Sequence, residues 1–170
     1  MKLYKENEYR ATDKWPYAIS AGCVVYRKTQ DSFEVLLLPR DNTTNKWGRD
    51  GGQRLSHHLP KGHVGFNETL IQAAQRETTE EAGVSAEIES YLGSREDNFK
   101  HPNTGIVTCK TVHYFAASWQ NDLKIKDNEH DNPIWVSLEV AENLLGPPMP
   151  KCEDEIIRRL RSFLELTDES

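Results

Sequence analysis

The chain has 170 residues, of which 28% are charged and 36% are hydrophobic, and its formal net charge is −6. This composition is ordinary for one folded domain with its own core, and the acidic balance argues against stable nucleic-acid binding, which depends on neutralising phosphates. No apolar run approaches the roughly 20 residues that a membrane-spanning helix needs, so no membrane association is expected.

The three cysteines, Cys23, Cys109 and Cys152, are odd in number and far apart, and the first residues lack the apolar core of a secretory signal. Both features favour reduced thiols in a cytoplasmic protein, and a nuclear location also fits. The sequence leaves the oligomeric state open.

The N-terminal third predicts two paired strands followed by a long connection. Residues 1–16 are a polar leader. The β-branched, apolar segments 17–27 and 33–40 are joined by the polar "KTQDS", a pattern typical of a hairpin. Residues 41–56 are rich in Asn, Thr and Gly, and a connection of this length indicates a functional loop or a disordered insertion.

A helix is predicted next, from about Glu68 to Ala82. Asn67 is its expected N-cap, and Gly83 stands where a helix commonly ends in a left-handed glycine. Its apolar stripe is expected to consist of residues at helical spacing, namely Leu70, Ile71, Ala74, Thr78 and Ala82.

The second half of the chain predicts three more strands and two more helices. The strands are expected at 84–93, 105–119 and 133–137, and a short helix near 138–145. A terminal helix follows from about Cys152 to Leu166. Strands interrupted by one helix and closed by others predict a single α/β (α+β) domain over 17–168, with a mixed sheet between helices.

Three carboxylates crowd one face of the first predicted helix. Glu77, Glu80 and Glu81 lie three and four residues apart, so their side chains project together and repel one another. The wider segment "GHVGFNETLIQAAQRETTEEAGV" (62–84) resembles the Nudix box, the loop–helix–loop of hydrolases that cleave nucleoside diphosphates linked to another moiety. Every Gly, Glu and Arg of that pattern is present. Thr78 replaces the usual bulky aliphatic residue.

The carboxylate cluster suits phosphoanhydride cleavage. That reaction requires neutralised phosphate oxygens and a water aimed in line with the leaving group. Magnesium prefers oxygen ligands, and cations among the carboxylates turn their repulsion into attraction. The resemblance implies Mg²⁺, for which Mn²⁺ can substitute, bound by Glu77 and Glu81. It implies that Glu80 is a metal ligand or the general base, that Arg76 braces the carboxylates, and that Glu68 is a brace or outer ligand.

The segments around the box are similar to those of asymmetrical dinucleoside tetraphosphate hydrolases. The matching strings are "LPKGH" before the box, "KTVHYFAA" (110–117) and "EHDNPIW" (129–135). The resemblance implies cleavage of diadenosine tetraphosphate to ATP and AMP. It also implies that Glu129 is an additional metal ligand or the rival base. The departures are Gly65, where these hydrolases have Glu, and His57, near where they have an aromatic residue.

Substrate contacts are expected from four residues, and each has a structural alternative. Lys61 and His63 would contact the polyphosphate, or be a solvated turn lysine and a capped loop histidine. Arg40 begins a stretch, continuing to His63, with five Lys or Arg and two acids, which is an anion-binding collar or a solvated loop. Tyr114 would stack on adenine, or be a core aromatic.

Other functions stay open at this stage. Zinc binding by His57, His58 and His63 is not favoured, because the adjacent pair does not converge easily with the third. A diphosphoinositol polyphosphate phosphohydrolase is a related Nudix class, but "PKGH" replaces the Gly-Gly pair usual before its box. A non-catalytic nucleotide-sensing Nudix module would typically lack box glutamates, and none is lost here.

Overall fold

The computed structural model describes residues 7–40, 56–101, 104–124, 132–147 and 152–168. Seven strands and three helices follow one another along these residues. They are β1 (Tyr17–Lys28), β2 (Phe33–Arg40), β3 (Ser56–His58), β4 (Lys61–His63), α1 (Leu70–Ala82), β5 (Val84–Lys100), β6 (Val107–Asp122), β7 (Ile134–Ser137), α2 (Leu138–Leu145) and α3 (Asp154–Asp168).

The seven strands form one mixed sheet. Five of them lie side by side in the order β3-β2-β1-β6-β5, and β4 and β7 lie off this path. β1 and β2 pair in antiparallel fashion, as the hairpin pattern predicted. β1 also pairs with β6, and this central pairing is parallel, from Tyr17 opposite Cys109 to Tyr26 opposite Ser118. β4 pairs with β1 and β7 pairs with β2, both in antiparallel fashion. β5 is longer than predicted, because its antiparallel pairing with β6 continues to Lys100.

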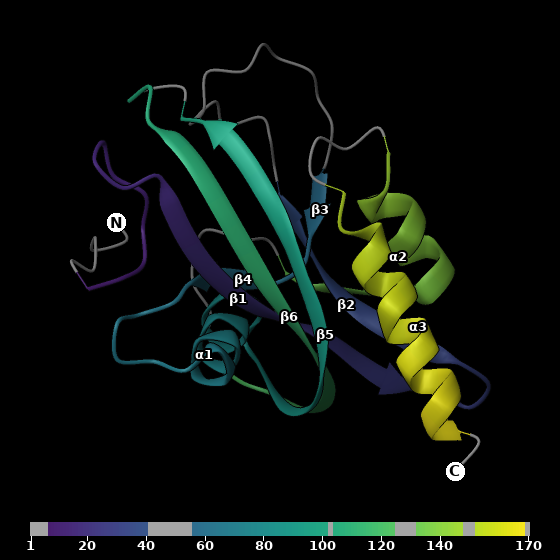
Figure 1. Cartoon of the computed structure of the whole chain (residues 1–170). Coiled ribbons are helices and arrows are strands. Elements are labelled where there is room, and N and C mark those ends of the chain that lie inside the picture. The colour runs from purple at the N-terminus through teal and green to yellow at the C-terminus, as the bar shows by residue number, and fades with distance from the viewer. Residues whose placement is uncertain (1–6, 41–55, 102–103, 125–131, 148–151, 169–170) are drawn as a thin grey trace.

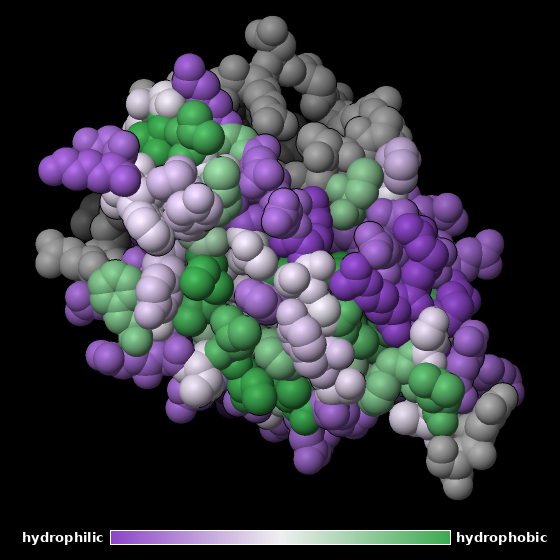
Figure 2. Space-filling view, in the orientation of Figure 1, coloured by the Kyte–Doolittle hydropathy of each residue, from purple (hydrophilic) through white to green (hydrophobic). Residues whose placement is uncertain are grey.

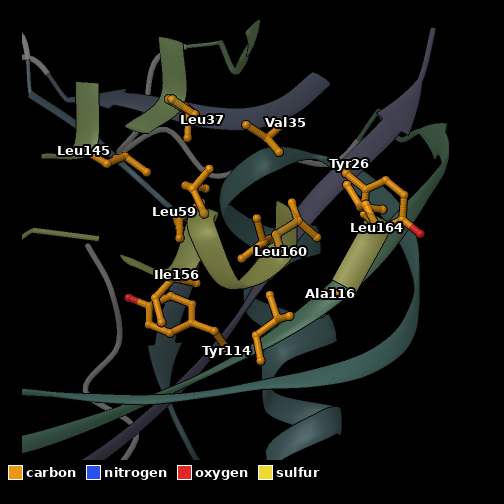
Figure 3. Close-up of a cluster of buried hydrophobic side chains, with 14 of the residues drawn as sticks. Tyr26, Val35, Leu37, Leu59, Tyr114, Ala116, Leu145, Ile156, Leu160 and Leu164 are labelled. Atoms are coloured by element: carbon orange, nitrogen blue, oxygen red, sulfur yellow. The ribbon is translucent and has the colours of Figure 1, made fainter. Parts of the chain in front are cut away.

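Helices cover both faces of the sheet, with α1 on one face and α2 and α3 on the other (Figure 1). Alternate residues of the strands point to opposite faces, so each face has its own hydrophobic cluster. The cluster under α2 and α3 contains Leu37, Leu59, Val112, Ile157 and Leu160. Figure 3 shows that α3 directs Ile156, Leu160 and Leu164 into this cluster. The predicted mixed sheet between helices is confirmed.

The cluster under α1 is built from smaller side chains. It contains Ala21, Cys23, Ala73, Ala74 and Ala82, with Leu36 and Leu38 from β2. Burial raises the pKa of the Cys23 thiol to about 11, so this thiol is protonated at neutral pH. Small residues let α1 approach the sheet closely, which brings its polar side chains near the strand β4.

The leader is in contact with the segment that precedes α1. The backbone N–H of Tyr9 donates to the oxygen of Val64 at 2.9 Å, and that of Phe66 donates to Asn7 at 2.8 Å. The rings of Tyr9 and Phe66 pack edge to face, with centroids 4.8 Å apart. The polar segment 7–10 therefore lies along residues 64–66, while the domain start at 17 stays a prediction.

Figure 2 shows that hydrophilic residues border the hydrophobic ones on one face of the molecule. No helix within the described ranges is both long and apolar enough to cross a membrane. Cys23, Cys109 and Cys152, all in described segments, form no disulfide.

Candidate active site

The helix that carries the carboxylates begins later than predicted. Thr69, and not Asn67, is the N-cap: its hydroxyl accepts from the N–H of Gln72 at 3.2 Å, and the Gln72 side chain accepts from the N–H of Thr69 at 2.9 Å. This reciprocal pair is a capping box. The helix ends as predicted at Gly83, whose φ of 67° is left-handed and whose N–H donates to Thr79.

The buried face of α1 contains carboxylates as well as alanines. Ala74, Thr78 and Ala82 are buried as predicted, but Ile71 is 46% exposed, so its place in the apolar stripe was wrong. Glu77 and Glu81 are only 4% and 5% exposed. Burying ionised carboxylates is costly unless hydrogen bonds or charges compensate them, so their surroundings must supply such partners.

Arg76 supplies the main compensation. Its Nε and Nη2 atoms donate to the two oxygens of Glu68 at 2.5 and 2.8 Å, and its Nη1 donates to Oε1 of Glu77 at 2.6 Å. Nη2 also reaches the backbone oxygen of His63 at 3.0 Å. The hydrogen bonds that Arg76 donates to Glu68 and Glu77 raise the pKa of Arg76 above its ordinary value. The contacts are those expected of a brace, and Glu68 joins it by accepting from the N–H of Gly65 at 2.8 Å.

The short loop that contains β4 (residues 59–63) lies directly against these carboxylates. The N–H of Lys61 donates to Oε2 of Glu81 at 3.0 Å. A Cβ atom at Gly62 would fall 2.0–2.3 Å from the carboxylate atoms of Glu77, far inside contact distance. Only glycine leaves room for the Glu77 carboxylate beside the backbone here.

Glu80 differs from the other two box carboxylates. Its side chain is 43% exposed, and its Oε2 accepts from Nη1 of Arg76 at 3.5 Å. A carboxylate held this loosely can reach solvent and can reorient. Glu77 and Glu81 are therefore packed against the loop, whereas Glu80 lies at the surface.

The donor set fits magnesium in chemical type. Glu77, Glu80 and Glu81 offer carboxylate oxygens, the ligands that this ion prefers, and Gly62 provides the close approach described above. Within the described residues, the side chains of His, Cys, Asp and Glu form no group of three spaced to share an ion. Arg76 and the Lys61 N–H instead occupy oxygens of Glu77 and Glu81 in this structure.

Lys61 and Tyr114 share a buried partner that the sequence did not indicate. The Lys61 ammonium lies 2.6 Å from Oε1 of Glu153, and the Tyr114 hydroxyl donates to the same oxygen at 2.5 Å. Tyr114 is fully buried beside Ile156 (Figure 3), which agrees with its alternative as a core aromatic, while stacking of its ring on adenine stays a prediction. Alternation of side chains along β6 does not say which face of the sheet Tyr114 points to, and helices cover both faces.

Of the remaining predicted site residues, His63 is described in full, Arg40 in part, and Glu129 lies outside the described ranges. His63 is half-buried in β4, next to the brace. The backbone of Arg40 ends β2 opposite Ser56, but its side chain is not described. Glu129 and residues 41–55 of the predicted insertion lie outside the described ranges. Lys61, Arg76, Glu77 and Glu81 are thus brought together, with Glu80 at the edge of the group.

Comparison with known proteins identifies the family of the chain. The NUDIX domain model matches residues 16–160. The chain is 32% identical to the asymmetrical bis(5'-nucleosyl)-tetraphosphatase of Caenorhabditis elegans over 123 residues, covering 72% of this chain and 80% of that protein. It is 29% identical to a diphosphoinositol polyphosphate phosphohydrolase of Homo sapiens over 145 residues, covering 85% and 72%.

A solved structure leads to the same family. The crystal structure of a C. elegans Ap4A hydrolase binary complex superposes with a TM-score of 0.62 at 28% identity, covering 87% of this chain and 98% of that one. The domain match spans most of the chain. The chain therefore belongs to the Nudix family.

Proposed function

We propose that this protein is a magnesium-dependent hydrolase of dinucleoside polyphosphates, and that it cleaves diadenosine tetraphosphate to ATP and AMP. The observation that carries the hydrolase assignment is the carboxylate cluster of α1, in which Glu77 and Glu80 accept from Arg76 and Glu81 accepts from the N–H of Lys61 in β4. The substrate assignment is supported by likeness to the C. elegans tetraphosphatase and by "LPKGH" and "EHDNPIW".

The proposed metal ligands are Glu77, Glu81 and Glu80, with Glu129 from outside the box. Bound magnesium, or manganese in its place, would supply positive charge that stabilises the phosphate oxygens. Arg76 keeps the Glu77 carboxylate oriented toward the loop through its 2.6 Å contact. Its bonds to Glu68 and His63 fix the guanidinium in turn.

Glu80 is the proposed general base. Its exposed carboxylate can take a proton from a water that attacks the phosphoanhydride in line with the leaving group. Lys61 and His63 belong to the loop beside these carboxylates and are proposed to contact the polyphosphate, with Arg40 as a further contact. The partner in this reaction is a small-molecule polyphosphate, and no nucleic acid is part of the proposal.

Product analysis tests the substrate assignment. With magnesium, diadenosine tetraphosphate should give equal amounts of ATP and AMP, and chelation of the metal should abolish the reaction. Two molecules of ADP per substrate would contradict asymmetrical cleavage. The same assay should be run on a panel of substrates that contains diadenosine polyphosphates, diphosphoinositols, capped RNA, nucleotide sugars and oxidised nucleotides.

Diphosphoinositol hydrolysis is the second candidate, because the alignment with the human phosphohydrolase extends over 85% of the chain. Turnover of diphosphoinositols without cleavage of dinucleotides would replace the first proposal with this one. Glu68, Glu77, Glu80 and Glu81 are all present, which argues against a non-catalytic nucleotide-sensing module. Binding of nucleotides with no turnover of any panel member would support that module.

A further inference from the structure

A carboxylate outside the box is buried at the start of α3. Glu153 is 2% exposed, and it accepts hydrogen bonds from two residues of the segment 59–61 and from one residue of β6. Oε2 accepts from the N–H of Leu59 at 3.0 Å, and Oε1 accepts from the Tyr114 hydroxyl at 2.5 Å and from the Lys61 ammonium at 2.6 Å. One side chain thus joins α3 and β6 to the loop that precedes the box.

The position of Glu153 is itself fixed by its backbone. Its N–H donates to the oxygen of Leu145 at the end of α2, at 3.0 Å, and its oxygen accepts from the N–H of Ile156 in the first turn of α3, at 3.1 Å. Burial alone would raise the pKa of Glu153, but the ammonium of Lys61 and the hydrogen bonds of Tyr114 and Leu59 bring it below its usual value. The carboxylate is therefore ionised and rigidly placed.

The loop is held at its other side by α1. While Leu59 and the Lys61 side chain bond to Glu153, the Lys61 backbone N–H bonds to Glu81, and Gly62 packs on Glu77. Residues 59–62 are therefore held between the carboxylate of Glu153, which directly precedes α3, and two carboxylates of α1. A displacement of the loop at Glu153 would move the groups that contact Glu77 and Glu81.

Among the described residues, two of the three donors of the Lys61 ammonium have partners, which leaves one for a ligand. An ammonium has three N–H donors. One is directed to Glu153 and a second to the backbone oxygen of Leu59 at 3.1 Å. The side chain is 15% exposed. The third hydrogen can therefore be presented to an anionic oxygen while the other two set its direction.

We propose that Glu153 is a positioning residue for the polyphosphate site, acting through Lys61 and the loop 59–62. This inference rests on the proposed function, in which Lys61 contacts phosphate. A buried ion pair is often no more stabilising than apolar residues of the same volume. Three matched donors on one buried carboxylate, all in or beside the loop, fit a requirement for fixed geometry better than a requirement for stability.

A double-mutant cycle tests the coupling. Glu153→Gln keeps the volume and removes the charge, and it should lower kcat/KM about 10- to 100-fold, as loss of a supporting contact typically does. Lys61→Met should lower kcat/KM by a similar factor. The double variant should be no worse than the poorer single variant, because Glu153 acts through Lys61. Losses that simply multiply would overturn the proposal, as would normal kcat/KM in a folded Glu153→Gln protein.

Glu155→Gln is the matched control. It makes the same substitution two residues later, at an exposed side chain whose partner is Arg159 at 2.6 Å, and it should leave kcat/KM unchanged. If Glu153→Gln alone does not fold, Glu153→Gln with Lys61→Met removes the unpaired buried ammonium, and Tyr114→Phe removes one donor while keeping the ion pair. Because the double variant also lacks the phosphate contact of Lys61, Tyr114→Phe then decides: a lower kcat/KM would support the proposal, and an unchanged kcat/KM would overturn it.

Amide hydrogen exchange separates failure of this proposal from failure of the proposed function. The Lys61 N–H should exchange faster in Glu153→Gln than in the wild type or in Glu155→Gln, with no substrate present. Equal exchange rates would overturn the positioning role even if the enzyme is active. If the wild type cleaves no member of the panel, the proposed function fails, while the exchange result still decides whether Glu153 fixes the loop.

Discussion

Helices α1 and α3 lie on opposite faces of one sheet and bury different chemistry. α3 buries Ile156, Ile157, Leu160 and Leu164, whereas α1 buries small residues together with Glu77 and Glu81. Both helices show apolar residues at helical spacing in the sequence. α3 therefore contributes chiefly hydrophobic burial. α1 buries less apolar surface, and it places carboxylates against a loop.

The sharpest test of this contrast is Glu80→Gln. Loss of a general base costs about 10²–10⁴ in rate, and added magnesium should not restore it. The stability of the protein should change by no more than about 0.5 kcal/mol, because the contact with Arg76 is long and exposed. The measurements are kcat at saturating magnesium and a urea unfolding curve.

Glu77→Gln and Glu129→Gln are the companion variants for this test. Glu77→Gln removes a proposed ligand, so added magnesium should partly recover its activity. Recovery of Glu80→Gln by magnesium, combined with no recovery of Glu129→Gln, would exchange the roles of Glu80 and Glu129.

Leu160→Ala should have the opposite profile. Truncating a fully buried leucine costs about 2–5 kcal/mol of stability, while the folded fraction should retain its kcat. Urea unfolding and kcat at a temperature well below the transition measure the two effects. A loss of kcat as large as that of Glu80→Gln, in protein that is still folded, would break the division between the two helices.

Gly62→Ala should damage the site through a single methyl group. Because the new Cβ would lie 2.0–2.3 Å from the Glu77 carboxylate, that carboxylate must move, and displacements of about 1 Å can cost about 100-fold in rate. Activity and magnesium affinity should both fall, as titration of activity with magnesium would show. Wild-type values for both would mean that the loop and Glu77 are not in contact in solution.

Thr69→Ala should have the smallest effect, because it acts on the helix end alone. Loss of an N-cap costs typically about 1 kcal/mol, and the capping box with Gln72 would be lost. Asn67→Ala is the control and should change the unfolding free energy much less. A larger effect at Asn67 than at Thr69 would restore the helix start predicted from the sequence.

The architecture was predictable because alternation and helical spacing are local signals. They gave the β1–β2 hairpin, the strands β5 to β7 and all three helices, with β5 too short. The helix start was wrong because Asn67 and Thr69 are both good caps, and the deciding signal is Gln72, three residues after Thr69. Ile71 was misplaced because it lies at the edge of the apolar stripe.

The box carboxylates and Arg76 were predictable because their spacing is fixed within one helix and one loop. Tyr114 was not, since alternation does not tell which sheet face binds substrate. Nor was Glu153, because nothing in the sequence separates it from its acidic neighbours Asp154 and Glu155. Its role depends on contacts with Leu59, Lys61 and Tyr114, which only the tertiary fold brings within reach.

The parallel pairing of β1 with β6 has a consequence for the protein during its synthesis. The hairpin of β1 and β2 and the helix α1 are local and can form as soon as they leave the ribosome. The centre of the sheet must wait for residues 109–118, since a parallel pair needs a long crossover. Glu153 emerges later still, so a nascent chain that already contains the whole box still has its loop 59–62 held from one side only. We therefore expect ribosome-bound chains arrested before residue 153 to have little activity, and activity to appear only after α3 has emerged.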